Sequence, residues 1–236
     1  FEEEALHALA VKAYEEKTGA RGLVSAAEKV LLKFEKRLPS TQIQQFVVTP
    51  EVVENPEREL EQLLADPSNS EMQARFQRLL SREKAALKES ILRREAEFRK
   101  RYGIVLLENR IAIIANRMIE KGYDVNTVIE EVVEIQRVVE DFERDFYRKH
   151  GISLRFSNEA TDRITEIALE EDGKGIGICS RLSKDFEHGF KLIRDRVGQR
   201  EFILTEEAID HPEAYLNRVI REIFSQYESQ KVEGRD

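Results

Sequence analysis

The sequence predicts a mainly helical fold with small β elements, of the α+β class. Charged residues fill 36% of the 236 positions, tryptophan is absent, and the chain holds only 5 prolines and 11 glycines. This composition is typical of helix-rich proteins with salt-bridged surfaces. Apolar residues also recur three and four positions apart along much of the chain, which is the period of an amphipathic helix. With 41% hydrophobic residues the chain can bury ordinary globular cores.

The first part of the chain is predicted to form two helices, a strand and a short helix. Apolar residues keep helical spacing over residues 5–13 until Lys17-Thr18-Gly19, where a glycine can end a helix. A second apolar face over residues 23–38 ends at a Pro-Ser pair. Residues 43–48 are β-prone, and Thr49-Pro50 is a helix start with threonine as the cap and proline at the first helical position.

The following segments set the predicted domain limits. Residues 54–69 are charged and contain two prolines, which predicts a linker, and a long, largely solvent-facing helix follows over residues 70–101. A shorter helix ends at Lys121-Gly122, and Asp124 caps a third. We therefore predict a first domain over residues 1–66, a helical linker over 67–123 and a second domain over 124–236.

The helix after Asp124 has the most regular apolar face in the chain. This face predicts packing against another long helix, and a groove that binds a partner is the alternative. Its members are Val125, Val128, Ile129, Val132, Ile135, Val139, Phe142 and Phe146.

The chain also repeats itself. Phe1, Ala13, Gly22 and Lys29 reappear 155 positions later as Phe156, Ala168, Gly177 and Lys184, and, after a one-residue slip, Thr49 and Pro56 reappear as Thr205 and Pro212. In the second copy, residues 152–156 and 201–204 are predicted to form a small sheet. By the same logic Phe1 is expected to end a strand that starts ahead of this sequence. A weaker similarity links residues 97–106 to 145–154, for which chance is the alternative.

Composition and motifs exclude several classes of function. A net charge of −8 argues against nucleic acid as a partner, and no apolar run approaches the ~20 residues of a membrane span. The single cysteine, Cys179, cannot form an internal disulfide, which fits a cytoplasmic location. No phosphate-binding loop, zinc motif or histidine cluster is present, so we expect no catalytic residue and no metal site. The first residue is phenylalanine and the only methionines are Met72 and Met118, which predicts a fragment or a processed product.

The candidate functional residues are Gly19, Ala20 and Arg21. The Gly-Ala-Arg-Gly run places an arginine at the start of a helix, where backbone N–H groups and the helix dipole already favour an anion. A guanidinium fork beside those donors suits a phosphate oxygen. In the alternative interpretation the glycines only make a tight turn and Arg21 pairs with a nearby carboxylate.

Residues 1–55 resemble a known family over several motifs in order. These are Phe1-Glu2-Glu3-Glu4-Ala5-Leu6, Glu16-Lys17-Thr18-Gly19-Ala20-Arg21-Gly22-Leu23, Leu38-Pro39-Ser40 and Phe46-Val47-Val48-Thr49-Pro50-Glu51. The run resembles the C-terminal small domain, or lid, of the ClpX-type Clp AAA+ ATPases. The resemblance implies that Gly19, Ala20 and Arg21 form the sensor 2 motif, with Arg21 reaching the terminal phosphates of ATP.

The resemblance also implies the cofactor and the partners. ATP and its magnesium ion would be held by a large domain upstream, so this fragment alone would not hydrolyse ATP. The partners would be that domain and the neighbouring subunits of a homo-oligomeric ring. The whole assembly would be a chaperone that unfolds or remodels proteins, so protein substrates or adaptors are further partners.

The second copy resembles the same family more loosely, over residues 136–210. Ile176 stands where the arginine is expected, which implies a lid-like fold without the sensor; compensation by Lys174 or Arg181 is the alternative. A typical ClpX-type chain ends soon after one small domain, whereas this one continues for ~180 residues. The second functional hypothesis is therefore a helical scaffold that binds another protein or an adaptor and has no nucleotide role.

Overall fold

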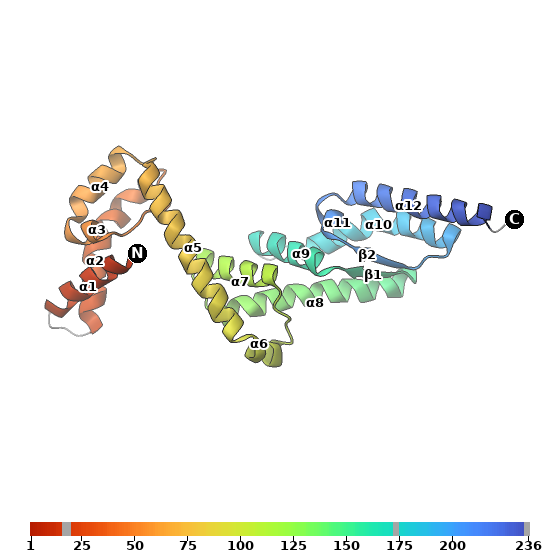
Figure 1. Cartoon of the computed structure of the whole chain (residues 1–236), viewed down its shortest axis with the longest axis horizontal. Coiled ribbons are helices and arrows are strands. Elements are labelled where there is room, and N and C mark those ends of the chain that lie inside the picture. The colour runs from red at the N-terminus through yellow and green to blue at the C-terminus, as the bar shows by residue number, and fades with distance from the viewer. Residues whose placement is uncertain (16–19, 172–174, 234–236) are drawn as a thin grey trace. The chain divides into compact units, whose positions relative to one another are not determined.

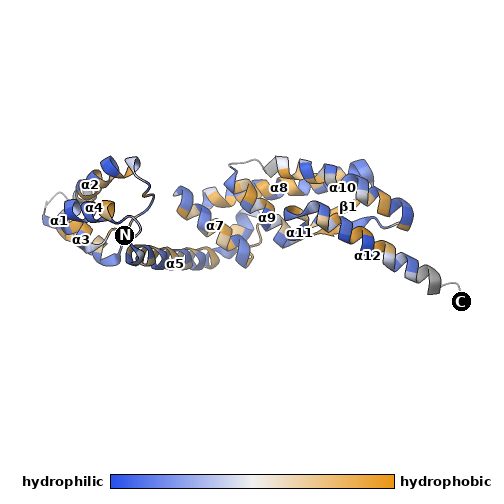
Figure 2. Cartoon of the chain, turned by 90° about the horizontal axis from the view of Figure 1, so that it is seen from above, coloured by the Kyte–Doolittle hydropathy of each residue, from blue (hydrophilic) through white to orange (hydrophobic). Residues whose placement is uncertain are grey.

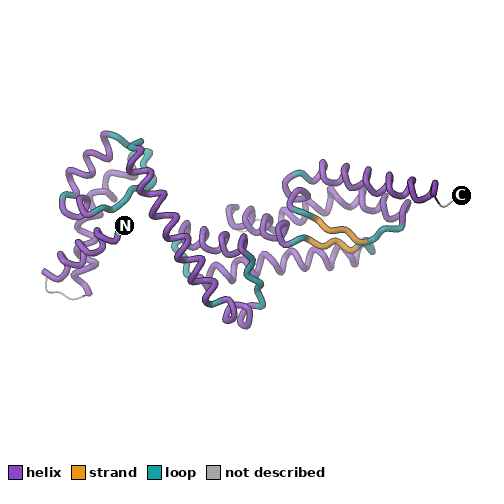
Figure 3. The backbone as a smooth tube through the Cα atoms, viewed as in Figure 1, coloured by secondary structure: helices purple, strands orange, loops and turns teal. Residues whose placement is uncertain are grey.

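The computed structural model describes residues 1–15, 20–171 and 175–233. They divide into two compact units, Phe1–Ala86 and Leu87–Asp236. Helices dominate both units, and in the described part of the chain one sheet of two short strands is present (Figure 3). The predicted class, mainly α with small β elements, is confirmed. Across the same residues, no helix is both long enough and apolar enough to cross a membrane.

The first unit is built from short helices around one core (Figure 1). Its elements are α1 (Glu3–Glu15), α2 (Ala20–Arg37), the 3₁₀ turn η1 (Leu38–Ser40), α3 (Pro50–Glu54), α4 (Pro56–Ala65) and the first part of α5 (Ser70–Arg93). The predicted start at Thr49-Pro50 is confirmed, because the Thr49 side chain accepts a hydrogen bond from the Val52 N–H. The buried core consists of Ala5, Leu9, Ala13, Ala26, Val30, Phe34, Val48, Val52, Val53 and Leu60.

Two predictions for this unit were wrong. Residues 56–65 are not part of a linker but form α4, because Pro56 starts the helix and Leu60 is buried in the core while the charges face solvent. Residues 43–48 are not a regular strand. A strand needs a partner for its backbone groups, and among residues 1–15 and 20–86 no other strand is present to pair with this segment.

The second unit contains the longer helices. The remainder of α5 leads into α6 (Glu95–Tyr102), α7 (Glu108–Lys121), α8 (Val125–His150), β1 (Ser153–Phe156), α9 (Asn158–Glu170), α10 (Gly175–Val197), β2 (Glu201–Leu204), α11 (Glu206–Asp210) and α12 (Pro212–Glu233). The predicted sheet is confirmed: β1 and β2 pair in parallel, from Ser153 opposite Glu201 to Phe156 opposite Leu204. The predicted long helix over residues 70–101 is interrupted at Arg94, where α5 has ended and α6 begins.

Helix α8 supports this unit along its whole length. Asp124 caps it as predicted by accepting the N–H groups of Asn126 and Thr127. Most of its apolar face is buried and the rest is half-buried, and the face contributes to two clusters of side chains, so the interpretation as a packing face is confirmed. Helix α5, by contrast, is largely hydrophilic along its length, as predicted (Figure 2).

The internal repeat is present in the structure. Helices α1, α2 and α3 in the first unit follow one another in the same order and spacing as α9, α10 and α11 in the second. The same backbone hydrogen bond also ties each first helix to the segment before the short third helix. The Glu2 N–H donates to the Val48 carbonyl at 3.0 Å, and the Ser157 N–H donates to the Leu204 carbonyl at 2.9 Å. The two copies therefore share a local fold and not only a residue pattern.

The weaker similarity between residues 97–106 and 145–154 also has a structural counterpart. Phe98 and Phe146 are both buried, and each helix then ends at a glycine with positive φ, 72° at Gly103 and 63° at Gly151. Each glycine N–H donates back into the last turn of its helix, and a buried isoleucine follows. The two segments thus share the same helix end and the buried isoleucine that follows it.

Candidate functional site: the start of helix α2

Arg21 is the second residue of α2 and its side chain is exposed. No carboxylate within the described ranges pairs with it. Gly19 lies outside the described residues. Ala20 begins the helix, but its side chain also lies outside what the structure describes.

The electrostatics of this helix end favour an anion. The first N–H groups of any helix lack partners within the helix, and the helix dipole puts partial positive charge at the same end. The first turn of α2 contains no acidic residue that would offset this charge, and Arg21 adds a full positive charge. The start of α2 can therefore attract a phosphate or carboxylate presented from outside the unit.

The rest of α2 is held firmly by the core of the first unit. Val30 and Phe34 are buried on its inner face, and the Phe34 ring stacks on Phe46 with centroids 4.6 Å apart and planes 6° from parallel. The Lys12 ammonium of α1 donates to the Val53 carbonyl of α3 at 2.5 Å. These contacts hold the helices of the unit together, so the position of Arg21 is set by packing.

The surface next to Arg21 is apolar and open. Leu23 is 47% exposed and Val24 59%, although both side chains are hydrophobic. The equivalent residues of the second unit, Ile178 and Cys179, are 3% and 4% exposed. The same helix start is therefore covered in one copy and uncovered in the other, which is typical of a surface that another module covers.

The corresponding site of the second copy is only partly described. Gly173 and Lys174 lie outside the described residues, and the side chain of Ile176 does as well. Arg181 is exposed on α10. The loss of the sensor in this copy therefore remains a prediction from the sequence.

The other groups considered for chemistry are Cys179 and the histidines. Burial raises the pKa of the Cys179 thiol to about 11, so at neutral pH it stays protonated and is a poor nucleophile. The described part of the chain contains no cluster of three or more metal-binding side chains. His7, His188 and His211 are exposed and far apart in sequence, whereas His150 is buried.

Sequence reasoning missed two buried arginines on α7. Arg110 donates to the Asp162 carboxylate of α9 at 2.7–2.8 Å, and Arg117 donates to the Leu169 carbonyl at 2.9 Å and to Glu131 at 3.0 Å. The two arginines lie seven positions apart, so they share a helix face. That spacing was the one signal in the sequence, and their role is to join α7 to α8 and α9.

His150 predicts a pH dependence of stability in the second unit. Burial lowers its pKa from the ordinary value of 6.5, outweighing the opposing effect of Glu187, while Lys149, Lys191 and Arg194 lower it further. The folded state then binds fewer protons than the unfolded state, so the stabilising contribution is complete above pH 6.5 and is lost as the pH falls through 6.5 toward the lowered value.

We expect the urea midpoint of the second unit to fall between pH 7.5 and pH 5. The His150→Phe variant should show a smaller fall, because the buried ring no longer titrates. His188→Gln changes an exposed histidine of α10 and is the matched control. An equal fall in His150→Phe and the unchanged protein would contradict this prediction.

Comparison with known proteins does not assign a family. No protein-family model matches the chain, and no solved structure matches it significantly.

Proposed function

We propose that this chain is the nucleotide-sensing lid, with a helical extension, of a cytoplasmic Clp-type AAA+ ATPase that unfolds or remodels proteins. The observation that carries the proposal is the exposed guanidinium of Arg21 in the first turn of α2, without an acidic partner in the described residues. ATP and its magnesium ion would be bound by a separate large domain. Gly19, Ala20 and Arg21 would approach the terminal phosphates from the lid.

The open apolar surface beside Arg21 supports this proposal. A phosphate held in water would gain little from one surface arginine, because solvent and salt screen the pair. A domain that docks over Leu23 and Val24 would exclude water and strengthen the interaction between Arg21 and a phosphate. The hydrophobic neighbours therefore suit an arginine that acts across a domain boundary.

The sequence supplies no means of hydrolysing ATP by itself. Its 236 residues contain no phosphate-binding loop with the lysine that such loops require. The chain would act by moving as one body. Nucleotide bound to the separate large domain would attract Arg21, and the whole first unit would move with it because α2 is packed into the core of that unit.

The test is ATP turnover by the longer protein that carries the ATP-binding domain. Arg21→Ala should lower turnover by about 10- to 100-fold, the equivalent of one charge-assisted hydrogen bond of about 1.5–3 kcal/mol. Arg37→Ala removes an exposed arginine from the last turn of the same helix and should change turnover less than about twofold.

The second candidate function, a helical scaffold without a nucleotide role, predicts the opposite result. It is favoured by the second copy, which keeps the helical plan although isoleucine replaces the arginine at position 176. If Arg21→Ala leaves ATP turnover unchanged, or if the longer protein neither binds nor hydrolyses ATP, the lid proposal is wrong and the scaffold remains.

A further inference from the structure

The first unit contains an apolar groove beside α2. Its volume is about 590 Å³, and it is lined mainly by Phe1, Leu31, Leu38, Ile43, Phe46 and Val48. We call it the α2 groove. Of these side chains Phe1 is 52% exposed, and Leu31, Leu38, Ile43 and Phe46 are half-buried.

The equivalent positions of the second copy are closed. Phe186, Ile193, Phe202 and Leu204 correspond to Leu31, Leu38, Phe46 and Val48, and their exposures are 0%, 0%, 6% and 0%. Phe202 also stacks on Phe190, with centroids 4.2 Å apart. Val48 is buried in the first unit as well, at 3%, whereas Leu31, Leu38 and Phe46 are only half-buried there. Three of the four hydrophobic positions are therefore covered in the second unit and partly open in the first.

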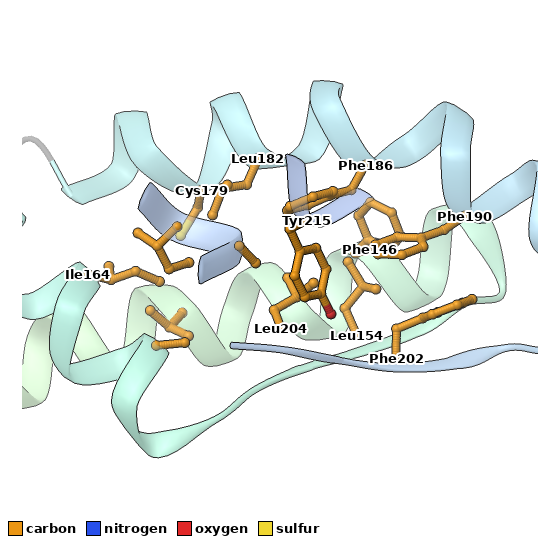
Figure 4. Close-up of a cluster of buried hydrophobic side chains, with 14 of the residues drawn as sticks. Phe146, Leu154, Ile164, Cys179, Leu182, Phe186, Phe190, Phe202, Leu204 and Tyr215 are labelled. Carbon is orange, nitrogen blue, oxygen red and sulfur yellow. The ribbon is translucent and has the colours of Figure 1, made fainter. Parts of the chain in front are cut away.

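The cover in the second unit is α8 together with β1. Phe146 on α8 and Leu154 on β1 point into the same cluster as Leu204 and Phe186 (Figure 4). β1 pairs in parallel with β2 and continues into α9. An acid on α8 also caps the end of β1, since the Phe156 N–H donates to Glu143 at 2.7 Å. The cover is thus one continuous segment, an amphipathic helix followed by a strand.

The backbone just ahead of α1 in the first unit follows the same path as the backbone between β1 and α9 in the second. The hydrogen bond from the Glu2 N–H to the Val48 carbonyl matches the bond from Ser157 to Leu204, which lies directly after β1. Phe1 is equivalent to Phe156 and itself lines the groove. A residue joined ahead of Phe1 would therefore continue along residues 44–48 in the parallel direction.

We propose that the α2 groove is the docking site for an amphipathic helix and a following strand joined directly ahead of Phe1. The strand pairs in parallel with residues 44–48, and the helix lays its apolar face on Leu31, Leu38 and Phe46. This inference does not depend on the nucleotide role proposed above. A covalently attached segment is favoured over a second copy, because it competes at a high effective concentration and because α8 and β1 of each copy are already buried in their own unit.

The test adds residues 135–155 of this chain ahead of Phe1 in the full chain, so that arginine precedes Phe1 as it precedes Phe156. The added segment supplies copies of Val139, Phe146 and Leu154 for the groove and of Glu143 for the Phe1 N–H. The control has the same addition with Val139→Glu and Phe146→Glu in the added copy only. Hydrogen exchange of residues 44–48 is measured in both proteins and in the chain without an addition.

We expect alternate amides of residues 44–48 to exchange at least about tenfold more slowly in the first protein than in the control, because a parallel strand would protect them. Equal exchange in the two extended proteins would overturn the proposal. Protection that already appears in the chain without an addition, and that rises with protein concentration, would assign the groove to a second copy instead and would also overturn it.

Discussion

Replacing Asp162 with alanine is expected to lower the free energy of unfolding of the second unit by about 3–5 kcal/mol, because it leaves the Arg110 charge buried without a counter-charge. The Arg110 and Asp162 side chains are only 5% and 6% exposed, and their closest atoms lie 2.7 Å apart. Burial raises the pKa of the Asp162 carboxyl more than Arg110 lowers it, which shows how strongly this site disfavours charge.

The experiment compares urea unfolding of the single variant with that of Arg110→Met combined with Asp162→Leu. The double variant should recover at least half of the loss, because replacing a buried ion pair by apolar groups of similar volume is often close to neutral. Arg163→Ala is the comparison for an ion pair nearer to solvent, because it removes a half-buried arginine that donates to Asp210. This variant should lower the free energy of unfolding by about 1 kcal/mol or less. A loss in Asp162→Ala no larger than that in Arg163→Ala would show that α7 and α9 do not depend on the buried pair.

Replacing Phe190 with alanine is expected to cost about 3–5 kcal/mol, the range for removing a large aromatic side chain from a core. Phe190 is fully buried on α10, and its ring stacks on Phe202 of β2 and on Phe186 one turn earlier. The loss combines the transfer of the ring to water with a cavity between α10 and the sheet (Figure 4).

The matched control is Tyr147→Ala on α8, an aromatic side chain of the same unit that is 60% exposed and should cost less than about 0.5 kcal/mol. Phe190→Leu, which keeps most of the apolar volume, should fall between the two. If Phe190→Ala unfolds at the same urea concentration as Tyr147→Ala, the cluster beneath α10 does not limit the stability of this unit.

Local signals in the sequence were sufficient for several helix ends and for the repeat. Asp124 and Thr49 were recognised as caps because a side-chain oxygen at that place accepts helix N–H groups, and Gly122 because glycine adopts positive φ at low cost. The two copies were recognised from residue identities alone. Helix caps depend on residues that are neighbours in the chain, and a repeat is a comparison of residue identities, so both can be recognised from the sequence.

Part of the candidate site at Arg21 could also be predicted from neighbouring residues in the sequence. The Gly-Ala-Arg-Gly run placed Arg21 at a helix start, and the helix dipole follows from that place alone. Whether a carboxylate neutralises Arg21, and whether Leu23 and Val24 are covered, depends on residues that are distant in the chain. Those two facts came from the tertiary structure.

The sequence by itself determined the helix starts at Thr49 and Asp124, the helix end at Gly122, and that one plan occurs twice. Only the tertiary structure decided that residues 56–65 form a helix, that residues 43–48 do not form a strand, and that Arg110 meets Asp162 across 52 positions of chain. The physical reason is that caps and periodicity act over one or two turns, whereas strand pairing, burial of charge and the shift of a pKa by burial depend on groups that folding brings together from far along the chain.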